Sequence, residues 1–294
     1  MSPKLRALIP FLFAWLWSTG FVSAKFGLPY AEPFTILSIR HALTIPVFAV
    51  IILVMGFNFG PLRAAPQQFL VGFFLHGLHL GGVFYAIDNG MPAGAAAIIV
   101  GLQPILSFIL ARAFFGEVLS KRQIIGLVIG FAGLLLVVIP DLRNATIPVV
   151  GVIGSLCGLV GLSVGTVMQK RMRAEMPLAT GSMYQFIGAL VVLGALSFTT
   201  ETQTIEPSWQ FFAAVAWLVF GISVTAMLLL TLMIRDGAVS EVAAYFYLVT
   251  PLAVLQAWVF FGEALSITAI LGGLMTVMGV YLATSKRGER AKVS

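Results

Sequence analysis

The residues best suited to chemistry are a few polar side chains that lie inside long apolar runs. Arg40 lies seven residues after Pro33, and His76 and His79 are three residues apart, on one face if that run is helical. A guanidinium binds carboxylates, and an imidazole hydrogen-bonds and titrates near neutral pH. Arg40 and His79 are therefore candidates for contacts with a small polar molecule.

Patterns for catalysis or metal binding are missing from the sequence. It has no Gly-x-x-x-x-Gly-Lys-Ser/Thr phosphate loop, no His-Glu-x-x-His pair, and a single cysteine, Cys157. Its hydroxyl side chains have no obvious acidic partner that would activate a nucleophile. We therefore expect no catalytic residue, no metal and no cofactor, and thus no enzyme.

Two aromatic residues are further candidates, for the wall around a bound molecule. Trp17 lies in the middle of the first apolar run, beside Ser18 and Thr19, and Tyr245 lies in a late apolar run. A rigid ring gives apolar contact at little entropic cost. We expect Trp17 and Tyr245 to line a pathway for a large neutral or aromatic substrate.

Two polar residues precede prolines inside apolar runs. Gln103-Pro104 in the first half of the chain corresponds to Thr250-Pro251 in the second half. A proline inside a helix removes a backbone hydrogen bond and kinks the helix, and the freed carbonyl needs a partner or a water-lined cavity. We expect Gln103 and Thr250 to line the pathway, and Pro104 and Pro251 to act as gating hinges.

Each candidate also has a structural interpretation, which the sequence leaves open. Arg40 either contacts a substrate carboxylate or locks helix ends together, and His79 either binds substrate or only hydrogen-bonds within the protein. Trp17 and Tyr245 either line the pathway or belong to ordinary packing. The prolines give either hinges or static bends.

Composition indicates what kind of protein must position these residues. Of 294 residues, 60% are hydrophobic and only 10% are charged, and the mean hydropathy is +1.03. Soluble domains are about a quarter charged, so this chain cannot cover a water-facing surface. Its apolar runs do not alternate with polar residues, which argues against an outer-membrane barrel. The net charge of +6 lies mostly in short loops and tails, as in membrane proteins, and does not indicate nucleic acid.

The apolar runs are long enough to cross a lipid bilayer, which takes about 20 helical residues. We therefore expect an all-α integral membrane protein with ten transmembrane helices. The expected helices lie at about 7–28, 33–56, 68–88, 92–114, 123–140, 148–168, 177–198, 208–233, 238–260 and 266–284. This assignment leaves no room for a soluble domain.

The distribution of basic residues predicts an orientation. With a cytoplasmic N-terminus, 14 of the 17 Lys and Arg residues fall in inside segments, as the positive-inside rule requires. An even number of helices returns the C-terminus to the same side. We expect a protein of a bacterial-type inner membrane with both termini in the cytoplasm.

The chain also resembles itself at a spacing of about 146 residues, since Phe115-Gly116-Glu117 corresponds to Phe261-Gly262-Glu263. We expect two five-helix repeats, residues 1–144 and 145–294, that form one integrated transport domain. An odd number of helices in each repeat gives the second repeat the opposite orientation. Inverted repeats with a site between them are an architecture of secondary transporters.

These features resemble the drug/metabolite transporter superfamily in its ten-helix EamA type. The resemblance rests on Trp17-Ser18, Arg40, Pro104 and the two Phe-Gly-Glu sequences, and it covers nearly the whole chain. His79 and Tyr245-Phe246-Tyr247 are similar to the YddG-type exporters. The resemblance implies a secondary transporter that exports neutral and aromatic amino acids by alternating access through a central cavity between the repeats.

Two other functions remain open at this point. The same fold also suits the export of drug-like cations or other metabolites, and a non-transporting membrane enzyme or receptor is a further class. All acidic residues can be placed near the ends of the expected helices, so a central carboxylate does not drive coupling. His79 could titrate near neutral pH.

Overall fold

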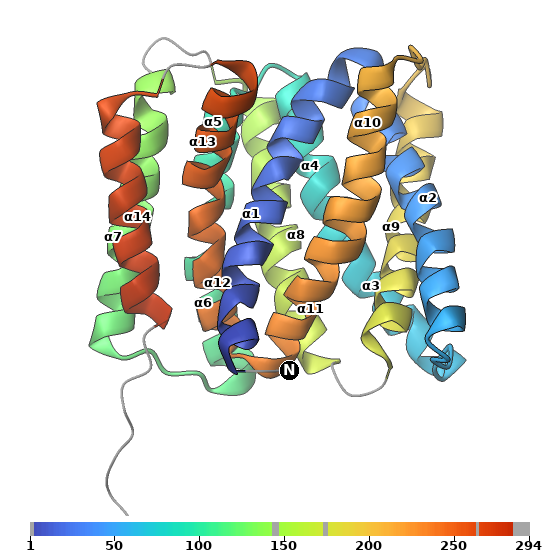
Figure 1. The fold of residues 1–294 in the computed structure, drawn as a ribbon, viewed down its shortest axis with the longest axis horizontal. Helices are drawn as coiled ribbons and strands as arrows, with labels where there is room; N and C mark the ends of the chain where they lie inside the picture. The colour runs from blue at the N-terminus through green and yellow to red at the C-terminus, as the bar shows by residue number, and fades with distance from the viewer. Residues whose placement is uncertain (1–2, 143–146, 173–175, 263–264, 285–294) are drawn as a thin grey trace, which may run out of the picture.

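The computed structural model describes residues 3–142, 147–172, 176–262 and 265–284. All regular elements of these residues are helical, and the long helices run side by side in one bundle (Figure 1). One isolated β-bridge joins Ala31 to Ile205. The all-α fold predicted from the apolar runs is confirmed.

The first half of the chain crosses the bundle in continuous helices or in pairs and triplets of shorter segments. Its elements are α1 (Pro3–Gly27), η1 (Leu28–Tyr30), α2 (Pro33–Val54), η2 (Leu62–Ala64), α3 (Ala65–Gly72), η3 (Phe73–Leu78), α4 (His79–Asp88), α5 (Ala93–Val100), α6 (Gln103–Phe115) and α7 (Lys121–Leu142). Here α3, η3 and α4 form one crossing, and α5 and α6 form the next.

The second half has the same order of long and broken crossings. Its elements are α8 (Val149–Arg171), α9 (Leu178–Thr200), α10 (Trp209–Trp217), η4 (Leu218–Ala226), α11 (Met227–Asp236), α12 (Val239–Ala244), η5 (Tyr245–Leu248), α13 (Val249–Phe261) and α14 (Ile267–Thr284). Here α10, η4 and α11 form one crossing, and α12, η5 and α13 form the next.

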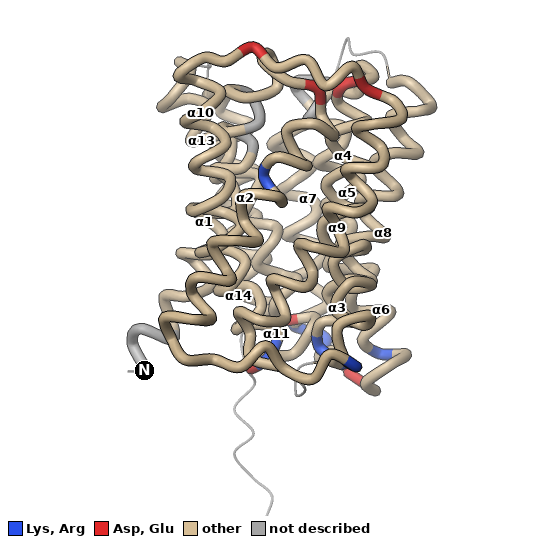
Figure 2. Tube along the Cα trace, turned by 90° about the vertical axis from the view of Figure 1, so that its right-hand side faces the viewer, with Lys and Arg blue, Asp and Glu red and all other residues tan. Residues whose placement is uncertain are grey.

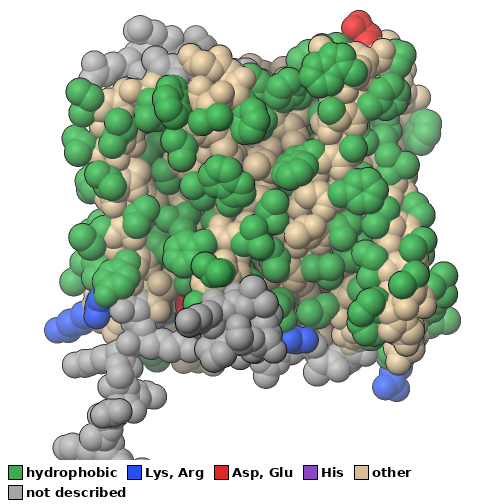
Figure 3. All heavy atoms as spheres, in the orientation of Figure 1, with side chains coloured by type: hydrophobic (Ala, Val, Ile, Leu, Met, Phe, Trp, Pro, Cys, Tyr) green, Lys and Arg blue, Asp and Glu red, His purple; other side chains and the backbone are tan. Residues whose placement is uncertain are grey.

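The flanks of the bundle are apolar, as lipid requires. In the described chain, nine helical stretches are long and apolar enough to cross a membrane, and Ala7–Gly20 of α1 is a shorter apolar stretch. They correspond one to one to the ten expected helices, and most of their ends agree to within a few residues. Figure 3 shows apolar side chains over the visible flank, and large residues such as Leu274 are 63% exposed.

Charge distinguishes the two ends of the bundle (Figure 2). The end at which the chain begins, called the basic end below, carries Arg63, Arg112, Lys121, Arg122, Lys170, Arg171 and Arg235. The opposite end, called the acidic end, carries Glu32, Asp88, Glu201 and Glu206. This asymmetry is the one that the positive-inside rule describes.

The two halves share their departures from regular helix. The third crossing of each half contains a π-helical segment, and η3 and η4 begin at Phe73 and Leu218, 145 residues apart. Gly116 and Gly262, 146 residues apart, end α6 and α13 with the same left-handed φ of +67°. Such irregularities do not arise from hydrophobic patterning alone, so they mark the two halves as structural repeats.

The repeats run in opposite directions through the bundle. α1 starts at the basic end, whereas α8 starts at the acidic end after five crossings (Figure 1). The expected boundary between residues 144 and 145 lies outside the described residues.

Equivalent helices of the two repeats pack against each other. α2 lies against α9, and two glutamates join this pair at the acidic end. The Glu201 carboxylate accepts hydrogen bonds from the backbone N–H groups of Phe34 and Thr35, both at 2.6 Å. The Glu32 carboxylate accepts one from the N–H of Thr202 at 2.8 Å. Glu201 therefore caps the N-terminus of α2, where the helix dipole favours a negative charge.

The contact between α7 and α14 depends on glycine. A methyl group on Gly133 would lie 2.6 Å from the backbone oxygen of Gly272 and from the backbone nitrogen of Thr276. Small residues permit such backbone contact in membranes, where the hydrophobic effect does not drive helices together. This pair joins the ends of the two repeats.

The α7–α14 contact gives the first prediction. Gly133→Ala should lower the free energy of unfolding by about 1–3 kcal/mol, because backbone atoms must move to admit the methyl group. Gly194→Ala in α9 is the matched control, because nothing lies within 4 Å of its added methyl group. Thermal unfolding of the purified protein in detergent measures both. Equal melting temperatures for the two variants would contradict the close contact.

Candidate functional site

A cavity of about 130 Å³ lies between the repeats, and both repeats line it. The wall is mostly aliphatic and aromatic, with a few polar groups. Its residues are Trp17, Gly20, Leu28, Arg40, His79, Leu80, Val83, Phe84, Ile87, Ala96, Ala97, Val100, Gly101, Pro104, Leu134, Leu162, Leu218, Ile222, Phe246, Tyr247, Val249 and Thr250. An apolar pocket with a few polar groups is typical of a small-molecule site.

The cavity lies where the fourth crossing of each repeat is interrupted. α5 ends at Val100 and α6 begins at Gln103, and the 3₁₀ segment η5 separates α12 from α13. Pro104 therefore lies in the first turn of α6, where a missing N–H costs no helical hydrogen bond. The prolines were expected to kink continuous helices; instead, Pro104 and Pro251 lie near the starts of half-helices.

Arg40 reaches the cavity from α2 and is only 4% exposed. Its Nε donates a hydrogen bond to the Ser223 hydroxyl of η4 at 2.7 Å, across the interface between the repeats. The described residues place no carboxylate in ion-pair contact with Arg40. Its Nη groups thus remain for a polar group inside the cavity.

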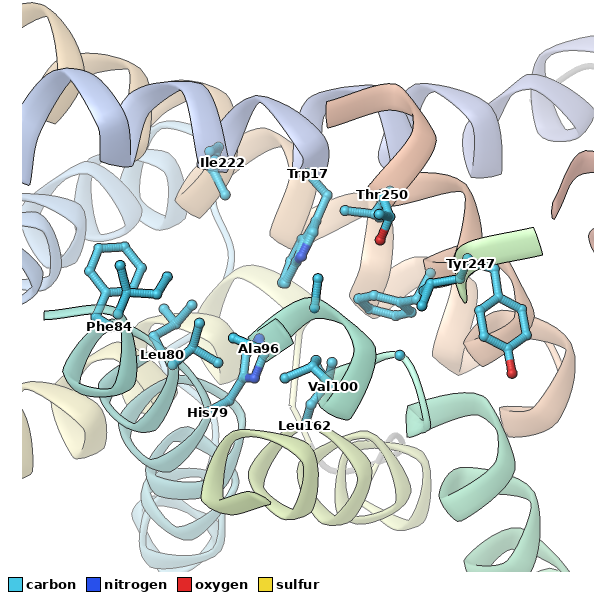
Figure 4. A pocket seen from close by; sticks show the side chains of 18 of the residues that line it. Trp17, His79, Leu80, Phe84, Ala96, Val100, Leu162, Ile222, Tyr247 and Thr250 are labelled. Atoms are coloured by element: carbon cyan, nitrogen blue, oxygen red, sulfur yellow. The ribbon is translucent and has the colours of Figure 1, made fainter. Parts of the chain in front are cut away.

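His79 also lines the cavity, directly after the π segment η3. Its Nδ1 lies 3.0 Å from the carbonyl oxygen of Gly158, so Nδ1 carries the proton and donates it. Nε2 is then an acceptor. In Figure 4, the rings of Trp17 and His79 point toward each other across the cavity.

Three packed rings separate the cavity from the basic end. The ring centroids of Phe13, Trp17 and Phe246 lie 5.2–5.5 Å apart. Trp17 and Phe246 face the cavity, whereas Phe13 lies one helical turn nearer the basic end and is fully buried. Trp17 therefore both lines the cavity and packs against the two other rings.

Tyr245 lies off the cavity wall. Its ring packs edge-on against Phe11, with centroids 6.1 Å apart, while Phe246 and Tyr247 line the cavity. The reason is the 3₁₀ turn at η5, which advances each side chain by about 120° rather than about 100°. The residue singled out in the sequence is therefore the direct neighbour of two lining residues.

Three other residues singled out in the sequence also lie off the wall. The Gln103 amide is buried and donates to the Ser107 hydroxyl of its own helix at 2.9 Å. Pro251 lies toward α14, where a Cβ on Gly273 would meet its Cβ at 3.4 Å. His76 stacks on Phe186 with ring centroids 4.5 Å apart, because the wider π turn separates it from the face of His79. Of the predicted set, Trp17, Arg40, His79, Pro104 and Thr250 line the cavity.

Sequence reasoning missed Ser223, which holds the Arg40 guanidinium. The signal available was the repeat itself, since Ser223 lies 144 residues after His79, close to the repeat spacing. Both residues lie at matched π segments of the third crossings. π-helical segments inside α-helices often mark functional sites, but the hydrophobic periodicity of a sequence does not reveal them.

Polar contacts join helical segments at the basic end. The Glu117 carboxylate accepts hydrogen bonds from the N–H of Val239 at 3.0 Å and from the hydroxyl of Ser240 at 2.6 Å. It thereby caps α12 of the opposite repeat. Lys170 of α8 donates to the carbonyl oxygens of Arg235 and Gly237. Glu263, the repeat counterpart of Glu117, lies outside the described residues.

Comparison with known proteins identifies the fold and the kind of protein. The EamA-like transporter family matches residues 5–139 and again residues 149–285. The chain belongs to the EamA-like transporter family. The two matched segments correspond to the two structural repeats, and the predicted membership is confirmed.

Several relatives match over nearly their whole length. The chain is 25% identical to the uncharacterized transporter YvbV of Bacillus subtilis, covering 97% of this chain and 93% of YvbV. It is 26% identical to the uncharacterized inner membrane transporter YedA of Escherichia coli, covering 96% and 92%. It is 23% identical to a probable amino-acid metabolite efflux pump of Salmonella typhimurium, covering 91% and 90%.

A solved crystal structure shares the EamA-like fold. It matches with a TM-score of 0.81 at 20% identity, and the match covers 96% of this chain and 97% of the other. This likeness supports the arrangement of the helices. The family match and the relatives show a membrane transporter.

The contacts of Glu117 with α12 lead to the second prediction. Glu117→Ala should raise the reaction rate of a cysteine placed at Thr250 with a membrane-impermeant maleimide applied from the basic end. The reason is that α12 loses its cap and the contact between the repeats loosens. The measurement uses membrane vesicles and a Cys157→Ser background. Glu206→Ala at the acidic end is the control, and equal rates in both variants would contradict a closing role for Glu117.

Proposed function

We propose that this EamA-like transporter exports neutral amino acids with apolar, chiefly aromatic, side chains. The observation that carries the proposal is Arg40, the only Lys or Arg among the described lining residues of a mostly apolar cavity walled by Trp17 and Phe246. The rings suit an apolar side chain, and the guanidinium suits the carboxylate of the same molecule. The name of the Salmonella relative, an amino-acid metabolite efflux pump, supports this substrate class.

Alternating access between the inverted repeats is the proposed mechanism. The cavity wall extends to Leu28 and Ile87, near the ends of crossings at the acidic end, while the aromatic cluster and Glu117 close the basic end. Exchange of conformation between two similar repeats would open the basic end and close the acidic end. The interrupted fourth crossings are the proposed moving parts, because their half-helices can tilt separately.

The proposed orientation places both termini in the cytoplasm of a bacterial-type inner membrane. The basic end carries the described loop arginines and lysines, and positive residues favour the cytoplasmic side. The cavity would then be open to the outside in this conformation. Export is the proposed direction.

A drug-like cation is the alternative substrate. Aromatic rings attract cations, but Arg40 repels them, and none of the lining residues in the described chain is acidic. An amino acid therefore fits the electrostatics of the cavity better. Because the described lining contains no carboxylate, it also lacks the carboxylate-based acid–base pair that an enzyme could use.

The third prediction tests transport directly. Proteoliposomes that contain the purified protein should exchange labelled phenylalanine, and Trp17→Ala should slow the exchange at least tenfold by removing the ring that contacts the side chain. Trp258→Ala is the matched control, because this tryptophan is 49% exposed on the lipid-facing surface of α13. Export of a methyl-viologen-like cation without phenylalanine would overturn the amino acid substrate.

A pH gradient across the proteoliposome membrane tests whether phenylalanine exchange is coupled to protons. The described lining offers no carboxylate to carry a proton, so exchange should proceed equally with and without the gradient. Exchange that requires the gradient would contradict facilitated export. It would direct attention to His79, which faces the cavity.

A further inference from the structure

We infer that the cavity recognises a carboxylate attached to an apolar body and does not require an α-amino group. This inference rests on the proposed function and changes its substrate class from amino acids to apolar monocarboxylates, of which neutral amino acids are members. It follows from an imbalance in the cavity, whose described lining residues include the cation Arg40 but no carboxylate.

Arg40 has the geometry of a carboxylate site. Its side chain is 96% buried, its Nε is occupied by Ser223 at 2.7 Å, and it lines the cavity. A guanidinium held at Nε can still present its Nη groups to a carboxylate, and buried charges in proteins are normally paired. Because the described residues supply no carboxylate to Arg40, a ligand is the partner that would satisfy it.

An ammonium group meets only neutral partners in the same cavity. The described lining contains neither aspartate nor glutamate. The groups that could accept a hydrogen bond from an ammonium include His79 Nε2, the Thr250 hydroxyl and the faces of aromatic rings. Removing an ammonium from water without an anionic partner is costly. The carboxylate therefore contributes an ion pair to binding, whereas the ammonium contributes no ion pair at all.

The number of cations limits the charge of the ligand. Arg40 is the only Lys or Arg among the described lining residues, so a dicarboxylate or a phosphate ester would keep an uncompensated negative charge. The remaining wall is apolar and includes Leu80, Phe84, Val100 and Ile222. A monoanion with an aliphatic or aromatic body satisfies both parts of the wall.

Three probes with the same phenyl ring separate the two charged groups. L-phenylalanine carries both charges, 3-phenylpropionate carries only the carboxylate, and 2-phenylethylamine carries only the ammonium. Each probe is titrated into the purified full-length protein, and binding is measured by the rise in melting temperature. Phenylalanine and 3-phenylpropionate should give similar dissociation constants. The amine should bind at least tenfold more weakly. Equal binding of the amine, or loss of binding with 3-phenylpropionate, would overturn the inference.

Variants assign the effect to Arg40. Arg40→Gln should abolish the preference for 3-phenylpropionate over the amine, and Arg235→Gln at the basic end should leave it unchanged. Arg235 is the matched control, because it is exposed and bonds to Asp236. If Arg40→Gln fails to fold, Ser223→Ala keeps the charge and should weaken carboxylate binding severalfold. An unchanged preference in Ser223→Ala would then contradict the proposed positioning.

The outcomes distinguish this inference from the proposed amino acid export. Binding of 3-phenylpropionate without any phenylalanine exchange supports the carboxylate site and overturns only the export of amino acids. Phenylalanine exchange that 2-phenylethylamine inhibits as strongly as 3-phenylpropionate supports export and overturns the carboxylate site.

Discussion

The constraint that organises this structure is a buried arginine in a largely apolar bundle of membrane-spanning helices. A charge near the centre of a membrane helix costs about 2.5–3.5 kcal/mol on insertion scales, so Arg40 must face other polar groups rather than lipid. Its Nε donates a hydrogen bond to the hydroxyl of Ser223, in the opposite repeat. The cation is therefore in place only when both repeats have assembled, and it lies where their cavity forms.

Irregular helix makes room for that cavity. In each repeat, the third crossing contains a π segment and the fourth is interrupted, at matched positions. The π segments place His79 and Ser223 at the interface, and the interruptions bring Pro104, Phe246 and Thr250 to the wall. Backbone that leaves the regular helix within a membrane is tolerated where it is buried in protein or lines a cavity.

The membrane crossings and the family could be predicted from the sequence, because they depend on the length of the apolar runs and on the repeat. Polar residues such as Arg40 and His79 could be singled out because burying a polar group is costly, and both line the cavity. The sequence was insufficient where the backbone changes period. Tyr245 was singled out at the 3₁₀ segment η5, where its neighbours Phe246 and Tyr247 line the cavity instead, and His76 was grouped with His79 across a π turn. Ser223 was not predicted because no sequence pattern distinguishes it from the other serines in apolar runs.

The most direct test of the account is a crystal structure of the protein with 4-bromo-phenylalanine, whose bromine is located by its anomalous scattering. The account predicts a bromine peak beside the rings of Trp17 and Phe246, with the carboxylate hydrogen-bonded to the Nη groups of Arg40. A bromine peak outside the cavity, or a carboxylate that faces away from Arg40, would contradict it.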